Sequence, residues 1–126
     1  MAGSVPTQIV EEARSGNVHV VKAQLGKEGS FTTEYPYYGF VTRIEVEYGE
    51  TPPSAAWTLH IEDEFALDLT GGRGAEIDEE CEFRLSHLRS GIPCHGPITF
   101  WADGLVDDEE SAIVTFYVAR FRATMQ

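Results

Sequence analysis

The sequence predicts an all-β protein: a single antiparallel β-sandwich, jelly-roll-like or immunoglobulin-like, of about seven strands. Two observations predict this fold. Apolar and polar residues alternate over short segments, as they do where one face of a sheet is buried. Turn signals separate nearly all of these segments, and none has a convincing helical period. The expected strands are Val18–Gly26, Gly39–Gly49, Trp57–Glu62, Phe65–Leu69, Cys81–Leu88, Ile98–Asp103 and Ser111–Ala123.

The first 16 residues differ from the rest of the chain. Residues 1–16 have mixed polarity and could form a helical turn or two, so we expect a weakly ordered arm that depends on a partner. Alternation begins at Asn17, and residues 17–126 are expected to form the β-sandwich domain. A domain of this size buries enough surface to need no disulfide framework.

The clearest strand is GFVTRIEVEYG, Gly39–Gly49. Strict alternation predicts one face with Phe40, Thr42, Ile44, Val46 and Tyr48, and the other with Val41, Arg43, Glu45 and Glu47. The preceding TTEYPYYG contains Pro36, which favours an edge or a lead-in over a central strand. Ser111–Ala123 is the most apolar segment, so we expect it in the centre of a sheet or buried on both faces.

The stretch WTLHIEDEFALDLTGG raises a question about its acidic residues. Alternation on both sides of Asp63-Glu64 predicts a hairpin with Phe65, Leu67 and Leu69 directed inward. A calcium loop would need a turn glycine and a distal acid, which this segment lacks. We therefore interpret the acids as the solvated rim of the hairpin; they are Glu62, Asp63, Glu64, Asp68 and Glu76.

Composition narrows the classes of partner. The chain has 9 Lys and Arg against 21 Asp and Glu, a formal net charge of −12, which disfavours binding to nucleic acid. The start of the chain has no apolar segment typical of a signal peptide, and no apolar run approaches the roughly 20 residues of a membrane span. We expect synthesis in the cytoplasm and no membrane partner.

The sequence contains no recognisable catalytic, cofactor or metal motif, so we expect no enzyme, no cofactor and no metal site. The glycines of TGGRGAE match no phosphate-binding motif and are expected to form a flexible loop. Two cysteines, Cys81 and Cys94, are too few for a disulfide framework, although a single bridge between them stays open. Zinc-ligand spacing is absent from the set His60, His87, His95, Cys81 and Cys94.

The order of these segments carries a resemblance. YYGFVTRIEVEYG, TPPSAAWTLHIEDEFALDLTGG and SAIVTFYVARF resemble, over roughly residues 38–122, small β-rich structural proteins encoded by tailed bacteriophages. In similar proteins the hairpin tends to read D-x-D-G-x-D-Φ-x-G-G. This chain keeps Asp63, Asp68, Gly71 and Gly72 but has Glu-Phe where the tip would carry glycine.

The resemblance implies a virion role as a head decoration (cement) protein on the capsid surface, made in the host cytoplasm, with the major capsid protein as partner. It implies no active site. Such a protein would form a homo-oligomer, a dimer or a trimer. We expect its contact surfaces in the aromatic segment and the arm, at Phe31, Tyr35, Tyr37, Tyr38, Ile9 and Val10.

Two alternatives stay open. One is another virion component, such as a tail or neck protein or a receptor-binding module. The other is a carbohydrate-binding β-sandwich, which would need Trp57 or Trp101 exposed on a flat or grooved face. Trp101 is opposite in parity to Ile98 and Phe100, so it can point outward if they point inward.

Overall fold

The computed structural model describes residues 5–13, 16–75, 77, 83–86 and 91–120. Within these residues the chain is all-β, with nine strands in two antiparallel sheets, and the predicted β-sandwich is confirmed. The strands are β1 (Gln8–Ala13), β2 (Val18–Leu25), β3 (Phe31–Thr32), β4 (Tyr37–Tyr48), β5 (Thr58–Glu62), β6 (Phe83–Ser86), β7 (Ile92–Gly96), β8 (Thr99–Asp103) and β9 (Ala112–Arg120).

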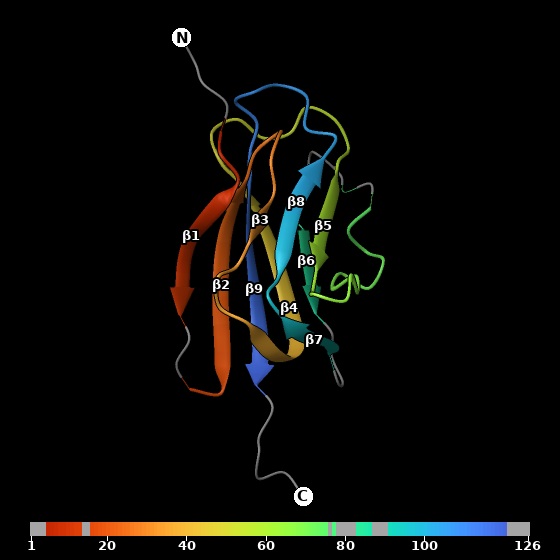
Figure 1. Ribbon diagram of the computed structural model, residues 1–126. Helices are drawn as coiled ribbons and strands as arrows, with labels where there is room; N and C mark the ends of the chain where they lie inside the picture. Colours follow the sequence, from red (N-terminus) through yellow and green to blue (C-terminus); the bar gives the residue numbers. More distant parts are fainter. Residues whose placement is uncertain (1–4, 14–15, 76, 78–82, 87–90, 121–126) are drawn as a thin grey trace, which may run out of the picture.

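Figure 1 shows the two layers. One is a 6-stranded sheet of order β1-β2-β9-β4-β6, in which β7 also pairs with β4, and the other is a 3-stranded sheet of order β3-β8-β5. From β2 onward, almost every connection crosses from one sheet to the other. Repeated crossing, with the first and last long strands paired at the centre, is the arrangement of a jelly roll.

The expectation of a weakly ordered N-terminal arm is wrong for the described part of residues 1–16. Gln8–Ala13 forms β1, which pairs with β2 with a bulge at Val10. Thr7 also donates to the Glu28 carbonyl oxygen at 3.0 Å. A Cβ atom on Gly26 would lie 1.8 Å from the Val5 carbonyl oxygen, so a glycine is required where this segment passes the end of β2. The polar residues that suggested an arm belong to an edge strand with one exposed face.

The prediction that the last apolar segment is central is confirmed. β9 lies between β2 and β4 and pairs with both along its length. Its alternate residues are buried, and those between them are half-buried. The strand ends at Arg120 within the described residues.

The predicted faces of β4 are wrong for its first half. Tyr37, Gly39 and Val41 face the core before a bulge at Thr42, and Ile44 and Val46 face it afterwards. The bulge adds one residue to β4 opposite β9 and so reverses the alternation. Phe40 accordingly points away from the sandwich core and is half-buried.

Residues Ile92–Gly96 lie outside all of the expected strands, but they form β7 against the start of β4. Pro93 is tolerated because, among the described strands, β7 pairs only with β4. The predicted strand Cys81–Leu88 is described only at Phe83–Ser86, where it forms β6. Cys81, Glu76 and His87 lie outside the described residues.

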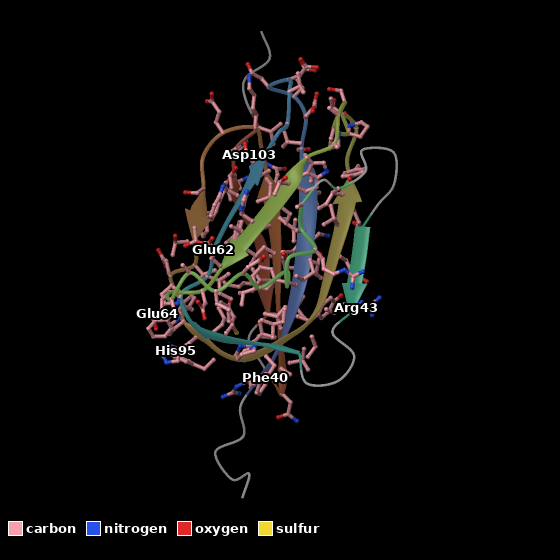
Figure 2. All side chains as sticks on the ribbon, turned by 90° about the vertical axis from the view of Figure 1, so that its right-hand side faces the viewer. Phe40, Arg43, Glu62, Glu64, His95 and Asp103 are labelled. Carbon is pink, nitrogen blue, oxygen red and sulfur yellow. The ribbon has the colours of Figure 1, made fainter. Side chains whose placement is uncertain are left out.

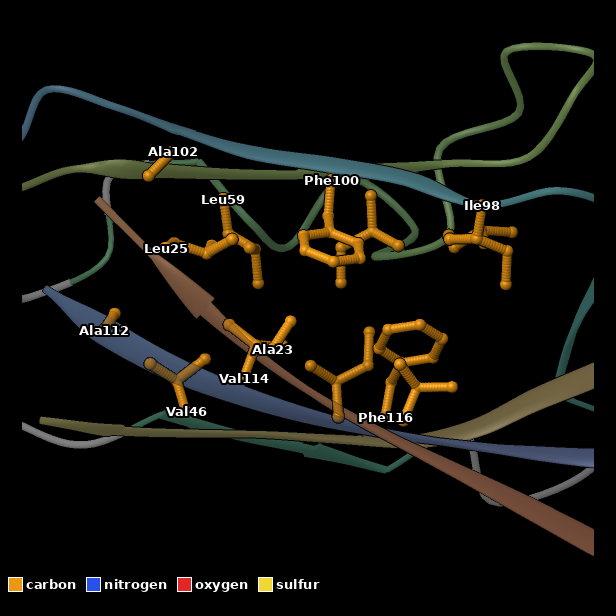
Figure 3. Packing of buried hydrophobic residues seen from close by; sticks show 14 of the residues in the cluster. Ala23, Leu25, Val46, Leu59, Ile98, Phe100, Ala102, Ala112, Val114 and Phe116 are labelled. Atoms are coloured by element: carbon orange, nitrogen blue, oxygen red, sulfur yellow. The ribbon is translucent and has the colours of Figure 1, made fainter. Parts of the chain in front are cut away.

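The core lies between the two sheets (Figure 3). Leu59 and Phe100 of the smaller sheet, together with Ile98 directly before β8, pack towards Val114 and Phe116 of β9. Trp57 is also buried, and its Nε1 donates to the Tyr48 hydroxyl at 3.0 Å. A buried indole with a satisfied N–H is a structural residue.

Candidate functional site

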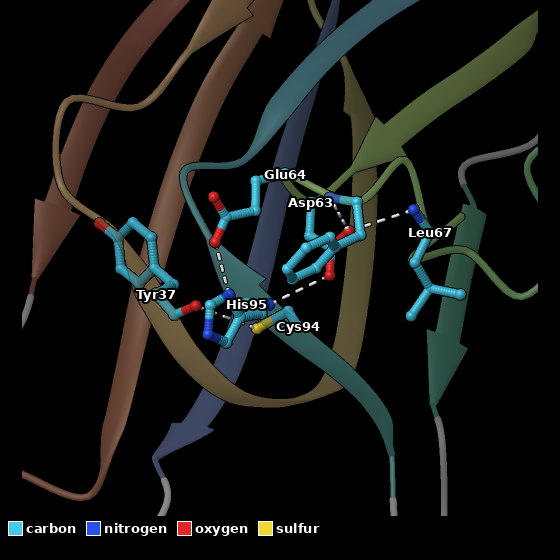
Figure 4. A network of polar contacts seen from close by, with 7 residues as sticks. Tyr37, Asp63, Glu64, Leu67, Cys94 and His95 are labelled. Carbon is cyan, nitrogen blue, oxygen red and sulfur yellow. Dashed lines mark hydrogen bonds and ion pairs between the residues drawn. The ribbon is translucent and has the colours of Figure 1, made fainter.

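The segment that follows β5 is organised by the Asp63 carboxylate (Figure 4). Its Oδ1 accepts hydrogen bonds from the backbone N–H groups of Phe65 at 2.9 Å and Leu67 at 3.1 Å, and its Oδ2 accepts one from His95 at 3.1 Å. Asp63 is only 7% exposed, so its interpretation as a solvated hairpin rim is wrong. A buried carboxylate with three backbone donors fixes the shape of a loop.

The predicted strand Phe65–Leu69 is also wrong, because these residues curl around Asp63. Leu69 is buried and its N–H bonds to the Ile61 carbonyl oxygen at 2.8 Å, but Phe65 is 71% exposed and Leu67 is exposed as well. Ala66 has a φ of 61°, which a non-glycine residue adopts only where its surroundings hold it. The loop therefore displays two large apolar side chains to solvent.

His95 on β7 completes an aromatic cluster beside this loop. Its ring lies 5.1 Å from the Phe65 ring and meets the Tyr38 ring edge to face at 4.7 Å. The Nδ1 atom of His95 also pairs with the Glu64 carboxylate (Figure 4). Figure 2 labels both residues at the same end of the molecule. The His95 ring is thus held by the neighbouring aromatic rings and by the Glu64 carboxylate.

An open hollow of about 560 Å³ lies within this region. Most of its surface is apolar, and its volume is in the range of small-molecule and peptide sites. We call it the Phe65 hollow; its lining residues are Asp63, Phe65, Ala66, Leu67, Pro93, Cys94 and His95.

Cys94 also lines the Phe65 hollow. Its thiol is buried and directed at the Tyr37 carbonyl oxygen at 3.8 Å. Burial, and secondarily the Asp63 carboxylate, raise the pKa of the Cys94 thiol to about 11. The thiol is therefore protonated at neutral pH and is a poor nucleophile.

Asp68 organises the glycine-rich segment that was expected to be flexible. Its Oδ1 accepts from the Thr70 N–H at 2.9 Å and the Thr70 hydroxyl at 2.7 Å, and its Oδ2 accepts from the Gly72 N–H at 2.9 Å. Partial burial raises the pKa of Asp68, but these hydrogen bonds outweigh it and hold the pKa below its usual value. Within the described residues no group of three or more His, Cys, Asp or Glu could hold a metal ion.

The six residues expected to bind a partner do not form one surface. Tyr38 is 45% exposed and lies in the aromatic cluster, while Tyr35 and the bulge residue Val10 are exposed elsewhere. Phe31 and Ile9 pack against the core as half-buried residues. Tyr37 is buried and its hydroxyl bonds to Glu12, so its side chain cannot form part of a contact surface.

Sequence reasoning missed Phe65, Leu67 and His95 as surface residues. The Asp63 carboxylate accepts hydrogen bonds from the N–H groups of the residues two and four positions ahead. This spacing has the same period of two as a β-strand, so the sequence pattern does not distinguish them. It also missed Glu110, a buried acid in an acidic loop. The consecutive acids of VDDEES gave no signal that one of them is buried.

Comparisons with protein-family models, with curated proteins and with solved structures find no match to this chain. The described residues also contain no helix that is long and apolar enough to cross a membrane.

Proposed function

We propose that this protein is a non-enzymatic structural protein of a tailed-bacteriophage virion, a head decoration protein that binds the major capsid protein and stabilises the head. One observation carries the proposal: a hydrogen-bonded loop holds Phe65 and Leu67 out of the core beside an apolar hollow. The resemblance of the strand pattern to small phage structural proteins supplies the virion context.

The loop has the physical properties of a preformed contact surface. Asp63 accepts three backbone N–H groups, and the loop backbone adds bonds from Ala66 N–H to the Asp63 carbonyl oxygen at 3.0 Å and from Glu64 N–H to the His95 carbonyl oxygen at 3.3 Å. A loop already fixed in shape loses little conformational entropy when it binds. Exposed aromatic side chains next to an apolar hollow supply the buried anchors on which interfaces depend.

The charge of the chain agrees with this role. A formal net charge of −12 favours a neutral or basic partner surface over nucleic acid and keeps the free protein soluble. Phe65, Leu67 and Tyr38 form the apolar centre of the surface, and the Glu64–His95 pair forms part of its polar rim. We propose that copies of the protein assemble as dimers or trimers on the capsid surface, after synthesis in the host cytoplasm.

The test is co-sedimentation of the purified protein with phage heads that lack it, with occupancy determined by cryo-EM. We expect saturable binding at fixed lattice positions, with the Phe65 hollow facing the shell. Binding to tails or necks but not to heads would replace the decoration role by the alternative virion role. Binding to neither would overturn the proposal.

A further inference from the structure

The outer face of the smaller sheet, on the side away from the core, carries polar and aromatic residues. In β8, Phe100 and Ala102 are buried, whereas Thr99, Trp101 and Asp103 lie on the outer face. The outer residues of β5 face them across the strand pair: Thr58 opposite Asp103, His60 opposite Trp101, and Glu62 opposite Thr99. Figure 2 labels Glu62 and Asp103 on these two strands.

The Trp101 ring stands on this face with one side covered. The His60 ring stacks on it at 4.5 Å with an interplanar angle of 7°. Because β8 lies between β5 and β3, His60 covers the indole from the β5 side. The other face of the indole is directed towards the β3 side.

A second hollow of about 380 Å³ lies on that side of Trp101. It is lined by Trp101, Thr99, Gly29 and Ser30, the last two from the loop that leads into β3. The Thr99 hydroxyl bonds to the Thr32 hydroxyl at 2.7 Å, and this pair retains one O–H donor and further acceptor lone pairs. The hollow therefore combines a flat aromatic wall with hydroxyl groups beside it.

We propose that Trp101 is the stacking platform of a binding site for a neutral pyranose unit of a saccharide. The C–H bonds on one face of a pyranose are weakly positive and match the negative face of an indole ring. The sugar hydroxyls find hydrogen-bonding partners in the Thr99–Thr32 pair and Ser30. Apolar stacking combined with a few oriented polar groups is the usual composition of a small-ligand site.

Charge determines which class of sugar fits. Glu62 and Asp103 lie on the same face, and no Lys or Arg occurs in β3, β5 or β8. Negative charge repels uronic and sialic acids, whereas carboxylates readily accept hydrogen bonds from neutral hydroxyls. The saccharide site does not depend on the proposed capsid contact. If many copies of the protein lie on one particle, their weak individual sites together would bind a saccharide-bearing surface with high avidity.

The test is titration of the full chain with soluble neutral oligosaccharides of glucose, mannose and N-acetylglucosamine, followed by NMR of the two indole N–H groups. The Trp57 N–H is buried and bonded to Tyr48, so it exchanges slowly with solvent and identifies itself without mutation. We expect one neutral oligosaccharide to shift the Trp101 resonance saturably and to leave that of Trp57 in place. A galacturonate oligomer of equal length should bind at least about tenfold more weakly.

The matched variants are Trp101→Ala and Phe65→Ala. We expect Trp101→Ala to weaken sugar binding at least about tenfold and Phe65→Ala to leave it unchanged. The proposal is overturned if no neutral oligosaccharide shifts the Trp101 resonance up to about 10 mM, or if the acidic oligomer binds as tightly. The wild-type titration decides the matter even where Trp101→Ala does not fold.

Discussion

A buried carboxylate fixes the loops at each end of the sandwich, but the residues exposed at the two ends differ in character. At one end, Asp63 accepts three backbone N–H groups and the loop around it displays Phe65 and Leu67. At the other, Glu110 accepts bonds from Ser54, Val106 and Asp107. We call these the Phe65 end and the Glu110 end.

The comparison shows that the exposed residues, and not the buried carboxylates, distinguish the two ends. Both carboxylates stabilise loops, so a buried acid here is a structural device and gives no indication of chemistry. The Glu110 end displays Asp107, Asp108 and Glu109, as expected of a solvated loop, together with one exposed valine, Val106. The Phe65 end displays a cluster of aromatic rings beside an apolar hollow, and the proposed binding role rests on that contrast.

The largest effect on stability is expected at Glu110. Its two oxygens accept from Ser54 N–H at 3.1 Å, Ser54 hydroxyl at 2.7 Å, Val106 N–H at 3.0 Å and Asp107 N–H at 3.1 Å. Glu110→Ala leaves these donors without their acceptor and should lower the free energy of unfolding by about 4 kcal/mol. Urea denaturation measures the loss, and Glu109→Ala, at an exposed acid of the same loop, is the control. A loss equal to that of the control would contradict the structural role.

A smaller loss, but one coupled to function, is expected at Asp63. Asp63→Ala removes the acceptor of three backbone N–H groups and should lower the free energy of unfolding by about 3 kcal/mol. The loop then loses the shape that positions Phe65, so binding to heads should weaken in protein that is still folded. Urea denaturation and co-sedimentation measure the two effects, with Glu109→Ala, at an exposed acid of the other end, as the control for the loss of one negative charge. If folded Asp63→Ala bound heads as tightly as the wild type, head binding would not depend on the shape of the loop.

The dependence of stability on pH gives a further test at the Glu110 end. Burial raises the pKa of Glu110, but bonds from Val106, Ser54 and Asp107 lower it by more, so its folded pKa lies below its ordinary value of 4.5. A depressed pKa stabilises the fold above the ordinary value, and this contribution is lost as the pH falls through the folded pKa. Asp68, with an ordinary value of 3.8, acts in the same direction but is largely exposed and contributes less.

We therefore expect the free energy of unfolding to fall as the pH decreases below about 4.5. Glu110→Gln should flatten that fall, because glutamine does not titrate. Chemical denaturation across this pH range measures the slope. An equally steep fall in Glu110→Gln would show that other carboxyl groups determine the acid sensitivity.

The smallest effect on stability is expected at Phe65 itself. Because its ring is 71% exposed, Phe65→Ala removes little buried area and should change the free energy of unfolding by no more than about 0.5 kcal/mol. Leu69 lies four residues further along the chain and is buried, so Leu69→Ala should lower the free energy of unfolding by about 3 kcal/mol. Thermal unfolding of the two variants distinguishes the displayed residue from the core residue.

The sequence predicted those elements in which local pattern and burial agree. β9 is the most apolar of the predicted strands and lies at the centre of the larger sheet, and the outward direction of Trp101 follows from its parity relative to Phe100. The faces of β4 could not be predicted in full, because the bulge at Thr42 depends on pairing with β9. β7 was missed because Pro93 and its flanking glycines are typical of a loop.

The candidate surface could not be predicted because its two parts meet only in the fold. Asp63 and His95 are far apart in the sequence, and their hydrogen bond exists only once β7 lies beside the end of β5. The alternation of Phe65, Leu67 and Leu69 fitted a strand as well as it fits a turn around a carboxylate. Exposure of an aromatic ring within such an alternation has no local sequence signal.

The most direct test of the central claim compares Phe65→Ala with Val106→Ala in co-sedimentation with phage heads that lack the protein. Both residues are large, apolar and exposed, Phe65 by 71% and Val106 by 51%, and they lie at opposite ends of the sandwich. The account predicts that Phe65→Ala lowers head affinity by about 2 kcal/mol, roughly thirtyfold, while Val106→Ala binds as the wild type does. Equal binding by the two variants, or a loss confined to Val106→Ala, would contradict it.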